Sequence, residues 1–262
     1  MNGLALRCAW LGALAAAPVW AGQALWARRR IPRLPEAAGP QEGGAQEGHA
    51  LRIVFLGEST VAGVGARTQE AALPGHTSAA LARALGRPVA WRALGRNGVT
   101  FARTLRHLVP ALPAEPPAVV LVALGVNDVI GFTSLRAFRR EARRLLDALR
   151  AYTGGLLVLA AVPPMARFPA LPQPLRAALG LRARLLDAEL RRLAASAPGC
   201  LHVPMDLDVS DPSLMAGDGF HPSERGYAAW GEQLARAVCA TLTPAPQAAS
   251  PTSVQPAGGS GR

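Results

Sequence analysis

The residues of this chain whose types and spacing could perform chemistry together are a serine, a histidine and an aspartate. Ser59 lies in a Gly-Glu-Ser-Thr segment, and Asp218 precedes His221 in Asp-Gly-Phe-His-Pro. A serine hydroxyl is a weak nucleophile until an imidazole accepts its proton, and a carboxylate on the other imidazole nitrogen fixes the tautomer. Because Asp218 and His221 share one loop, a single turn can place the carboxylate on Nδ1 while Nε2 points at Ser59. These residue types therefore predict nucleophilic acyl transfer.

Acyl transfer also needs hydrogen-bond donors for the negative charge that develops on the attacked carbonyl oxygen. Gly98 ends a Gly-Arg-Asn-Gly segment, and Asn127 lies in Gly-Val-Asn-Asp. We expect the oxyanion hole to consist of the Asn127 side-chain amide and the backbone amides of Ser59 and Gly98. Gly95 lies close to Gly98, and only geometry separates these two glycines.

The elements that must position these residues alternate along the chain. Apolar runs of strand length, bounded by Gly or Pro, lie at 51–57, 88–94, 117–125, 155–163 and 200–204. Segments with apolar residues at helical spacing lie at 76–85, 134–152, 175–195 and 223–240. Continuous apolar strands separated by helices indicate a parallel sheet that is covered on both faces. We therefore predict an α/β fold, a three-layer α/β/α sandwich with a five-stranded parallel sheet.

Each candidate residue follows one of the predicted strands, where parallel sheets bind their ligands. Taken singly, each has a simpler interpretation: Ser59 and Asn127 as helix caps, and Gly98 as part of a turn. The Asp218 loop could likewise be a turn before the last helix. Several loops at one sheet edge that hold the parts of one reaction favour the catalytic interpretation.

The same segments, in the same order, resemble the sequence blocks of the SGNH (GDSL-type) hydrolase superfamily of esterases, lipases, thioesterases and acyltransferases. The resemblance implies a flavodoxin-like SGNH hydrolase fold and a serine esterase that needs no metal and no organic cofactor. It implies that Ser59 is the nucleophile, with Asp218 and His221 as its triad partners. It also implies that Gly98 and Asn127 join Ser59 in the oxyanion hole.

The resemblance covers residues 53–227 and has one visible departure. The chain has Glu58 where the family name gives an aspartate before the serine. That acid is not a triad member, so we expect the replacement to change local hydrogen bonding and to leave the nucleophile in place.

The expected activity is hydrolysis of a small-molecule or lipid carboxylic ester through an acyl-enzyme. An acyltransferase or a thioesterase would use the same residues, because exclusion of water is a property of the closed site. We expect the apolar, proline-rich segment 165–174, which contains Phe168, to wall the acyl pocket. An alternative of a different class is a membrane-anchored binding protein without turnover, which would not need all of the candidate residues.

The charge balance is strongly basic, with 28 Lys+Arg against 17 Asp+Glu and a net charge of +11, and all the cations are arginines. An acidic partner such as nucleic acid is one interpretation. However, the excess is spread through the chain and no aromatic-interleaved basic motif accompanies it, so no nucleic-acid partner is expected. The sequence does not indicate an oligomeric state.

The N-terminal stretch from Cys8 to Trp26 is apolar apart from Gln23, and Arg28-Arg29-Arg30 follow it. Positive charge beside an apolar run tends to stay in the cytoplasm, so we expect membrane association through a single anchor and a cytoplasmic domain. Export after cleavage of a signal peptide is the alternative.

The expected organisation has four parts. They are an anchor or signal segment at 1–30, a flexible Pro- and Gly-rich linker at 31–50, an SGNH hydrolase-type esterase domain at 51–240 and a disordered tail at 241–262.

Overall fold

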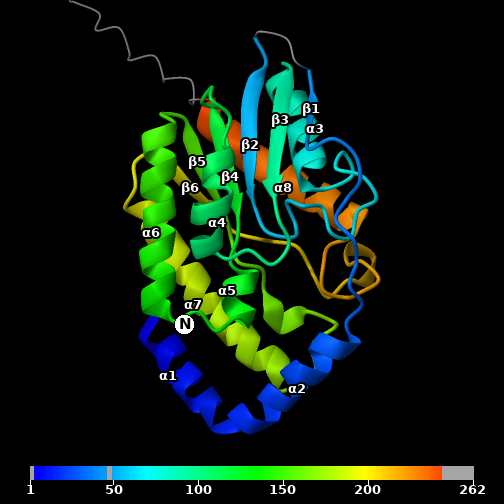
Figure 1. Cartoon of the computed structure of the whole chain (residues 1–262), viewed down its shortest axis with the longest axis vertical. Helices are drawn as coiled ribbons and strands as arrows, with labels where there is room; N and C mark the ends of the chain where they lie inside the picture. The colour runs from blue at the N-terminus through cyan, green and yellow to red at the C-terminus, as the bar shows by residue number, and fades with distance from the viewer. Residues whose placement is uncertain (1–2, 46–48, 244–262) are drawn as a thin grey trace, which may run out of the picture.

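Five apolar runs of the chain form the parallel strands of a single sheet in a computed structural model, which describes residues 3–45 and 49–243 (Figure 1). The sheet has six strands in the order β1-β3-β2-β4-β5-β6. Their bounds are β1 (Glu42–Gly44), β2 (Leu51–Gly57), β3 (Val89–Gly95), β4 (Val119–Ala123), β5 (Leu156–Ala160) and β6 (Cys200–Val203). Strands β2 to β6 pair in parallel, so the predicted parallel sheet is confirmed.

The register of the central strands brings their carboxyl ends to one level. Gly57, the last residue of β2, pairs with Gly95 of β3 and with Ala123 of β4. The loops after these three strands therefore start side by side.

Helices cover both faces of the sheet, which confirms the three-layer α/β/α arrangement (Figure 1). Helices α3 (Leu73–Leu85) and α8 (Glu224–Leu242) share one apolar cluster with Ile53 and Phe55 of β2. Val54 and Leu56 face the opposite cluster, because successive strand residues point to opposite faces. That second cluster includes residues of α4 (Phe101–His107), α6 (Leu135–Tyr152) and α7 (Leu175–Ala195).

Several shorter elements complete the chain. Helix α5 (Val126–Ile130) directly follows β4. The 3-10 turns are η1 (Leu14–Ala16), η2 (Val109–Ala111), η3 (Met165–Arg167) and η4 (Pro212–Leu214). The sequence pattern did not predict α4 or α5, since helices this short show too few turns for a period to emerge.

The sixth strand lies in the segment that was expected to be a flexible linker. Strand β1 pairs antiparallel with β3 at the edge of the sheet. Glycines permit this approach: a Cβ on Gly43 would meet the Trp91 ring, and one on Gly44 would lie 2.0 Å from the Val89 carbonyl oxygen. The five predicted parallel strands are all present, and β1 adds one short antiparallel strand at the edge. The expected disordered tail lies, from residue 244 on, outside the described residues.

The N-terminal apolar stretch forms α1 (Gly3–Ala13), the turn η1 and α2 (Ala17–Arg30). Together, Ala5–Arg30 are long and apolar enough to be a membrane anchor or a signal sequence. Both helices lie at the same end of the molecule as α5 (Figure 1).

Candidate active site

Ser59 lies in a tight turn at the carboxyl end of β2. The turn begins at a crowded point of the backbone, because a Cβ on Gly57 would lie 2.4 Å from the Ala123 carbonyl oxygen. The amides of Val61 and Ala62 donate to the Glu58 carbonyl oxygen. The buried nucleophile candidate is therefore fixed by backbone hydrogen bonds on one side and by the sheet on the other.

The structure brings Ser59, His221 and Asp218 together. His221 Nε2 lies 3.0 Å from Ser59 Oγ, and His221 Nδ1 lies 2.6 Å from Asp218 Oδ2. The other carboxylate oxygen, Asp218 Oδ1, accepts hydrogen bonds from the amides of Phe220 and His221. Burial alone would raise the pKa of Asp218, but the hydrogen bonds from His221 and Phe220 outweigh burial and lower it. The carboxylate is thus held ionised against the imidazole.

Contacts with the rest of the fold hold the His221 loop in place. The Ala216 amide donates to the His221 carbonyl oxygen over 2.8 Å. The buried Tyr227 hydroxyl, on α8, donates to the carbonyl oxygen of Val64 over 2.6 Å. That bond ties the helix after His221 to the turn after Ser59, so two segments far apart in sequence are held in one arrangement.

Two backbone amides are candidate donors for an oxyanion hole. No hydrogen bond within the described residues uses the N–H of Ser59 or of Gly98. Gly98 has φ +80°, a conformation that favours glycine. Gly95 has a different task, since a Cβ there would lie 2.3 Å from the Ala62 amide nitrogen. Geometry therefore separates the two glycines: Gly95 allows close packing, and Gly98 offers a free donor.

Asn127, the third expected donor, lies at the start of α5 with its amide hydrogens occupied. Its Nδ2 donates to the Val99 carbonyl oxygen at 3.0 Å and to Glu58 Oε2. The side-chain amide must rotate away from Glu58 before Nδ2 can donate to a substrate oxygen.

Glu58 is the residue at this site whose importance the sequence did not reveal. Its side chain is buried, with 3% exposed, and its oxygens also accept from the amides of Val126 and Asn127. Burial raises the pKa of Glu58 to about 8, against the opposing effect of the hydrogen bonds from Asn127 and Val126. The only sequence signal was the departure from Gly-Asp-Ser: the longer side chain reaches the N-terminus of α5.

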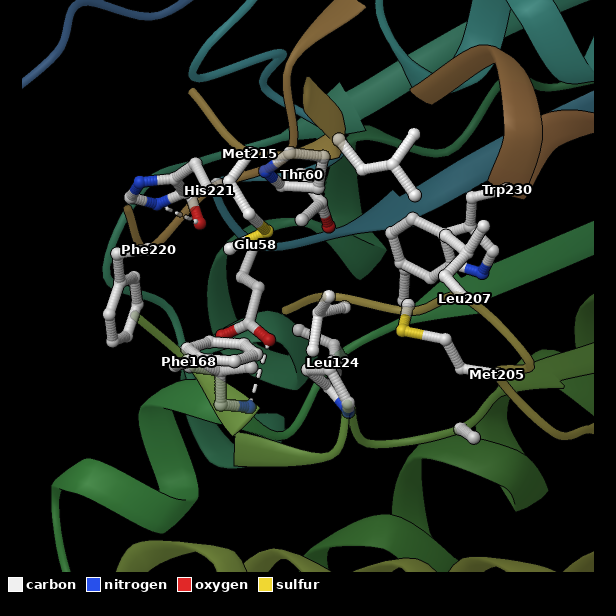
Figure 2. A pocket seen from close by; sticks show the side chains of 18 residues that line it. Glu58, Thr60, Leu124, Phe168, Met205, Leu207, Met215, Phe220, His221 and Trp230 are labelled. Atoms are coloured by element: carbon white, nitrogen blue, oxygen red, sulfur yellow. Dashed lines mark hydrogen bonds between the residues drawn. The ribbon is translucent and has the colours of Figure 1, made fainter. Parts of the chain in front are cut away.

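An apolar pocket opens beside Ser59 and His221 (Figure 2). Phe168 lines it, as expected for the segment 165–174, and packs edge-to-face on Phe220 at a centroid distance of 5.2 Å. The other large apolar lining residues are Leu124, Met205, Leu207, Leu214, Met215 and Trp230. Such a pocket suits the hydrocarbon part of an acyl or alkyl group.

The part of the chain that the structure describes contains no group of three or more His, Cys, Asp or Glu side chains that could hold a metal ion. The polar atoms around the pocket are instead the serine, imidazole, carboxylate and amide groups described above.

Three comparisons with known proteins agree with one another. A model of the GDSL-like Lipase/Acylhydrolase family matches residues 55–229. The GDSL-like esterase Rv1075c of Mycobacterium tuberculosis is 28% identical in an alignment 245 residues long, which covers 85% of this chain and 76% of that protein.

Solved structures share the fold at lower identity. The psychrotrophic esterase EstA from Pseudoalteromonas sp. has a TM-score of 0.58 and 18% identity, over 73% of this chain and 98% of that one. The family 3 carbohydrate esterase of Clostridium thermocellum has a TM-score of 0.56 and 17% identity, over 74% of this chain and 98% of that one.

Proposed function

Since the chain belongs to the GDSL-like lipase/acylhydrolase family and is an ester-hydrolysing enzyme, we propose that it cleaves carboxylic esters through a Ser59-His221-Asp218 triad. The observation that carries this proposal is the continuous hydrogen-bonded line from Ser59 Oγ through both imidazole nitrogens to the Asp218 carboxylate. The line ends on a buried acid that its hydrogen bonds keep ionised.

In the first half-reaction Ser59 Oγ attacks the ester carbonyl carbon, and His221 Nε2 takes the serine proton. Asp218 stabilises the imidazolium through Nδ1. The tetrahedral intermediate then collapses as Nε2 gives that proton to the leaving alkoxide, so an alcohol departs and the acyl group stays on Ser59. In the second half-reaction water attacks the acyl-enzyme and His221 accepts a water proton. The second tetrahedral intermediate collapses as Nε2 gives that proton to Ser59 Oγ, so the carboxylic acid departs and free Ser59 is restored.

The negative charge on the carbonyl oxygen is stabilised by the amides of Ser59 and Gly98, which have no other acceptor within the described residues. Asn127 adds a third donor when its side-chain amide rotates from Glu58 towards the oxyanion. Preorganised donors of this kind contribute about 10²- to 10³-fold each to kcat.

The apolar pocket supports a small-molecule or lipid ester whose hydrocarbon part lies against Phe168 and Phe220. The sulfur, aromatic and aliphatic side chains of the lining offer few hydrogen-bond partners for a sugar. An apolar acyl or alkyl group is therefore the better fit.

The deciding experiment is Ser59→Ala. We expect hydrolysis of a short-chain nitrophenyl ester to fall by about 10⁴-fold or more, since the nucleophile is lost. Labelling by a fluorophosphonate, which reacts with an activated serine, should disappear as well; EstA is described as inhibited by monoethylphosphonate. The matched control is Ser196→Ala, an exposed serine that follows α7. Retained hydrolysis in Ser59→Ala with a folded protein would remove Ser59 from the mechanism.

A further inference from the structure

Helices α1 and α2 show an inverted polarity. From Cys8 to Trp26 the outward residues are apolar, including Leu11, Leu25 and Trp26 with exposed fractions of 65%, 63% and 51%. The one amide side chain of this stretch, Gln23, instead faces the domain, where it donates to the Gln173 carbonyl oxygen and accepts from the Leu175 amide. A helix that met only water would present the opposite arrangement.

The segment is packed on the domain by its inner side. Trp20 and Ala27 are buried, and the Trp20 ring stacks on Phe132 at a centroid distance of 5.3 Å. The turn η1 breaks the segment between the two helices. A straight membrane-spanning helix would lose the packing of Trp20 and Ala27 on the domain as well as the Gln23 hydrogen bonds.

The exposed apolar surface continues from the helices onto the domain. Ile130 and Phe132, at the end of α5, are among the exposed large hydrophobic residues. Phe132 lies under the rings of Trp10 and Trp20, and the Arg182 guanidinium lies over Phe132 at 5.2 Å from its centroid. A contiguous apolar surface of this kind marks a contact with a protein or a membrane.

Arginines flank this surface, and their charge favours a membrane over a protein as the partner. Arg7 is exposed on α1, and Arg28, Arg29 and Arg30 are exposed at the end of α2. No ion pair within the described residues involves any of them. Leu25 and the Arg28–Arg33 stretch line one surface hollow together. Apolar side chains beside unpaired arginines match the acyl chains and phosphates at the surface of an anionic bilayer.

We propose that α1 and α2 lie in the surface of a bilayer that contains anionic phospholipid while they stay packed on the domain. The outward apolar side chains enter the acyl region, and the flanking arginines contact headgroup phosphates. Because Gln23 donates to Gln173, in the segment 165–174 that also contains the pocket residue Phe168, this segment lies next to the lipid in the proposed arrangement. The proposal does not depend on the role of Ser59.

The test is flotation of the full-length protein with vesicles of phosphatidylcholine alone or mixed with phosphatidylglycerol. We expect flotation with the mixed vesicles and much less with phosphatidylcholine alone. Leu25→Glu/Trp26→Glu, and separately Arg28→Ala/Arg29→Ala/Arg30→Ala, should each weaken binding by about tenfold or more. The matched control is Arg140→Ala/Arg143→Ala/Arg144→Ala, which removes the same charge from the exposed face of α6 and should bind normally.

A cross-link separates surface binding from spanning. Cysteines at positions 23 and 173, joined by a short bismaleimide in a background without the native cysteines, hold α2 on the domain. The joined protein should still float with the mixed vesicles, and circular dichroism checks that each variant is folded. Loss of flotation on cross-linking would overturn the proposal in favour of a spanning segment. The proposal would also be overturned if the native protein did not float and instead formed a dimer in which a second copy covers this surface.

Discussion

Two buried carboxyl groups flank Ser59, and their surroundings push them in opposite directions. Asp218, on the His221 side, has a lowered pKa because its hydrogen bonds outweigh burial. Glu58, on the Asn127 side, has a pKa raised to about 8, since burial outweighs its amide donors. At neutral pH the acid behind the imidazole is therefore charged, and the acid beside the oxyanion hole is protonated. The surroundings, rather than the residue type, assign each acid its task.

This division has a catalytic logic. In the proposed mechanism a charge at Asp218 stabilises the imidazolium that forms during attack, whereas a charge at Glu58 would repel the oxyanion. An ionised Glu58 would also hold the Asn127 Nδ2 hydrogen more strongly than a neutral Glu58 does. Asp128, on α5 and also buried, adds to the upward shift of the Glu58 pKa.

The largest expected effect comes from removing the charge on the His221 side. Asp218→Asn should lower kcat by about 10⁴-fold while the fold is kept, because the imidazole loses both its tautomer and its stabilising charge. The measurement is kcat for a nitrophenyl ester, with Asp206→Asn as control for a carboxylate outside the line of hydrogen bonds. A loss below about tenfold would show that Asp218 is not the partner of His221.

Replacement of the acid on the Asn127 side, Glu58, is expected to leave activity at neutral pH nearly unchanged. Since Glu58 is neutral below pH 8 and charged above it, we expect kcat of the native enzyme to decline as the pH rises through about 8. Glu58→Gln cannot ionise, so it should keep neutral-pH activity within a few-fold and lack this decline, whereas exposed Glu70→Gln should keep it. If kcat of Glu58→Gln still declined at alkaline pH, ionisation of Glu58 would not be the cause, and the assigned difference between Glu58 and Asp218 would be contradicted.

Stability gives a second readout of the same group. A pKa raised above its ordinary value of 4.5 means that the folded state binds the proton more tightly than the unfolded state. The free energy of unfolding therefore falls as the pH rises from about 4.5 to about 8, and Glu58→Gln should flatten that part of the Tm profile.

The smallest expected effect sharpens the comparison by changing burial alone. Phe168 and Glu58 both line the apolar pocket (Figure 2). Phe168→Ala should admit water, lower the Glu58 pKa and move the alkaline decline to lower pH. It should also change the preference along an ester chain-length series, because the pocket becomes wider. An unchanged decline and an unchanged chain-length profile would mean that Phe168 neither dries Glu58 nor walls the acyl pocket.

The sequence predicted those parts of the molecule that depend on local pattern. The parallel strands and long helices follow from their apolar periods, and the strand-end positions of Ser59, Asn127 and His221 follow from the rule that parallel strands end at one edge. Their catalytic roles stay proposals. Strand β1 could not be predicted, because its three residues show no period and depend on glycines opposite Trp91 and Val89.

The Glu58 contacts could not be predicted for a different reason. Its donors come from residues 68 and 69 positions away, at the start of a helix too short to be recognised. Whether a buried acid ends up charged or neutral depends on that tertiary arrangement, and no local pattern encodes it. The choice between Gly95 and Gly98 was equally dependent on which backbone each approaches.

The short strand β1 also shields the molecule from its own copies. It pairs with Ala90, Trp91 and Arg92 of β3, and its short length and glycine content make it a poor template for further strands. A shortened chain that began at β2 would leave the apolar strand Val89–Gly95 as a bare edge, open to strand-by-strand association. Strand β1 thus protects this edge of the sheet from such association.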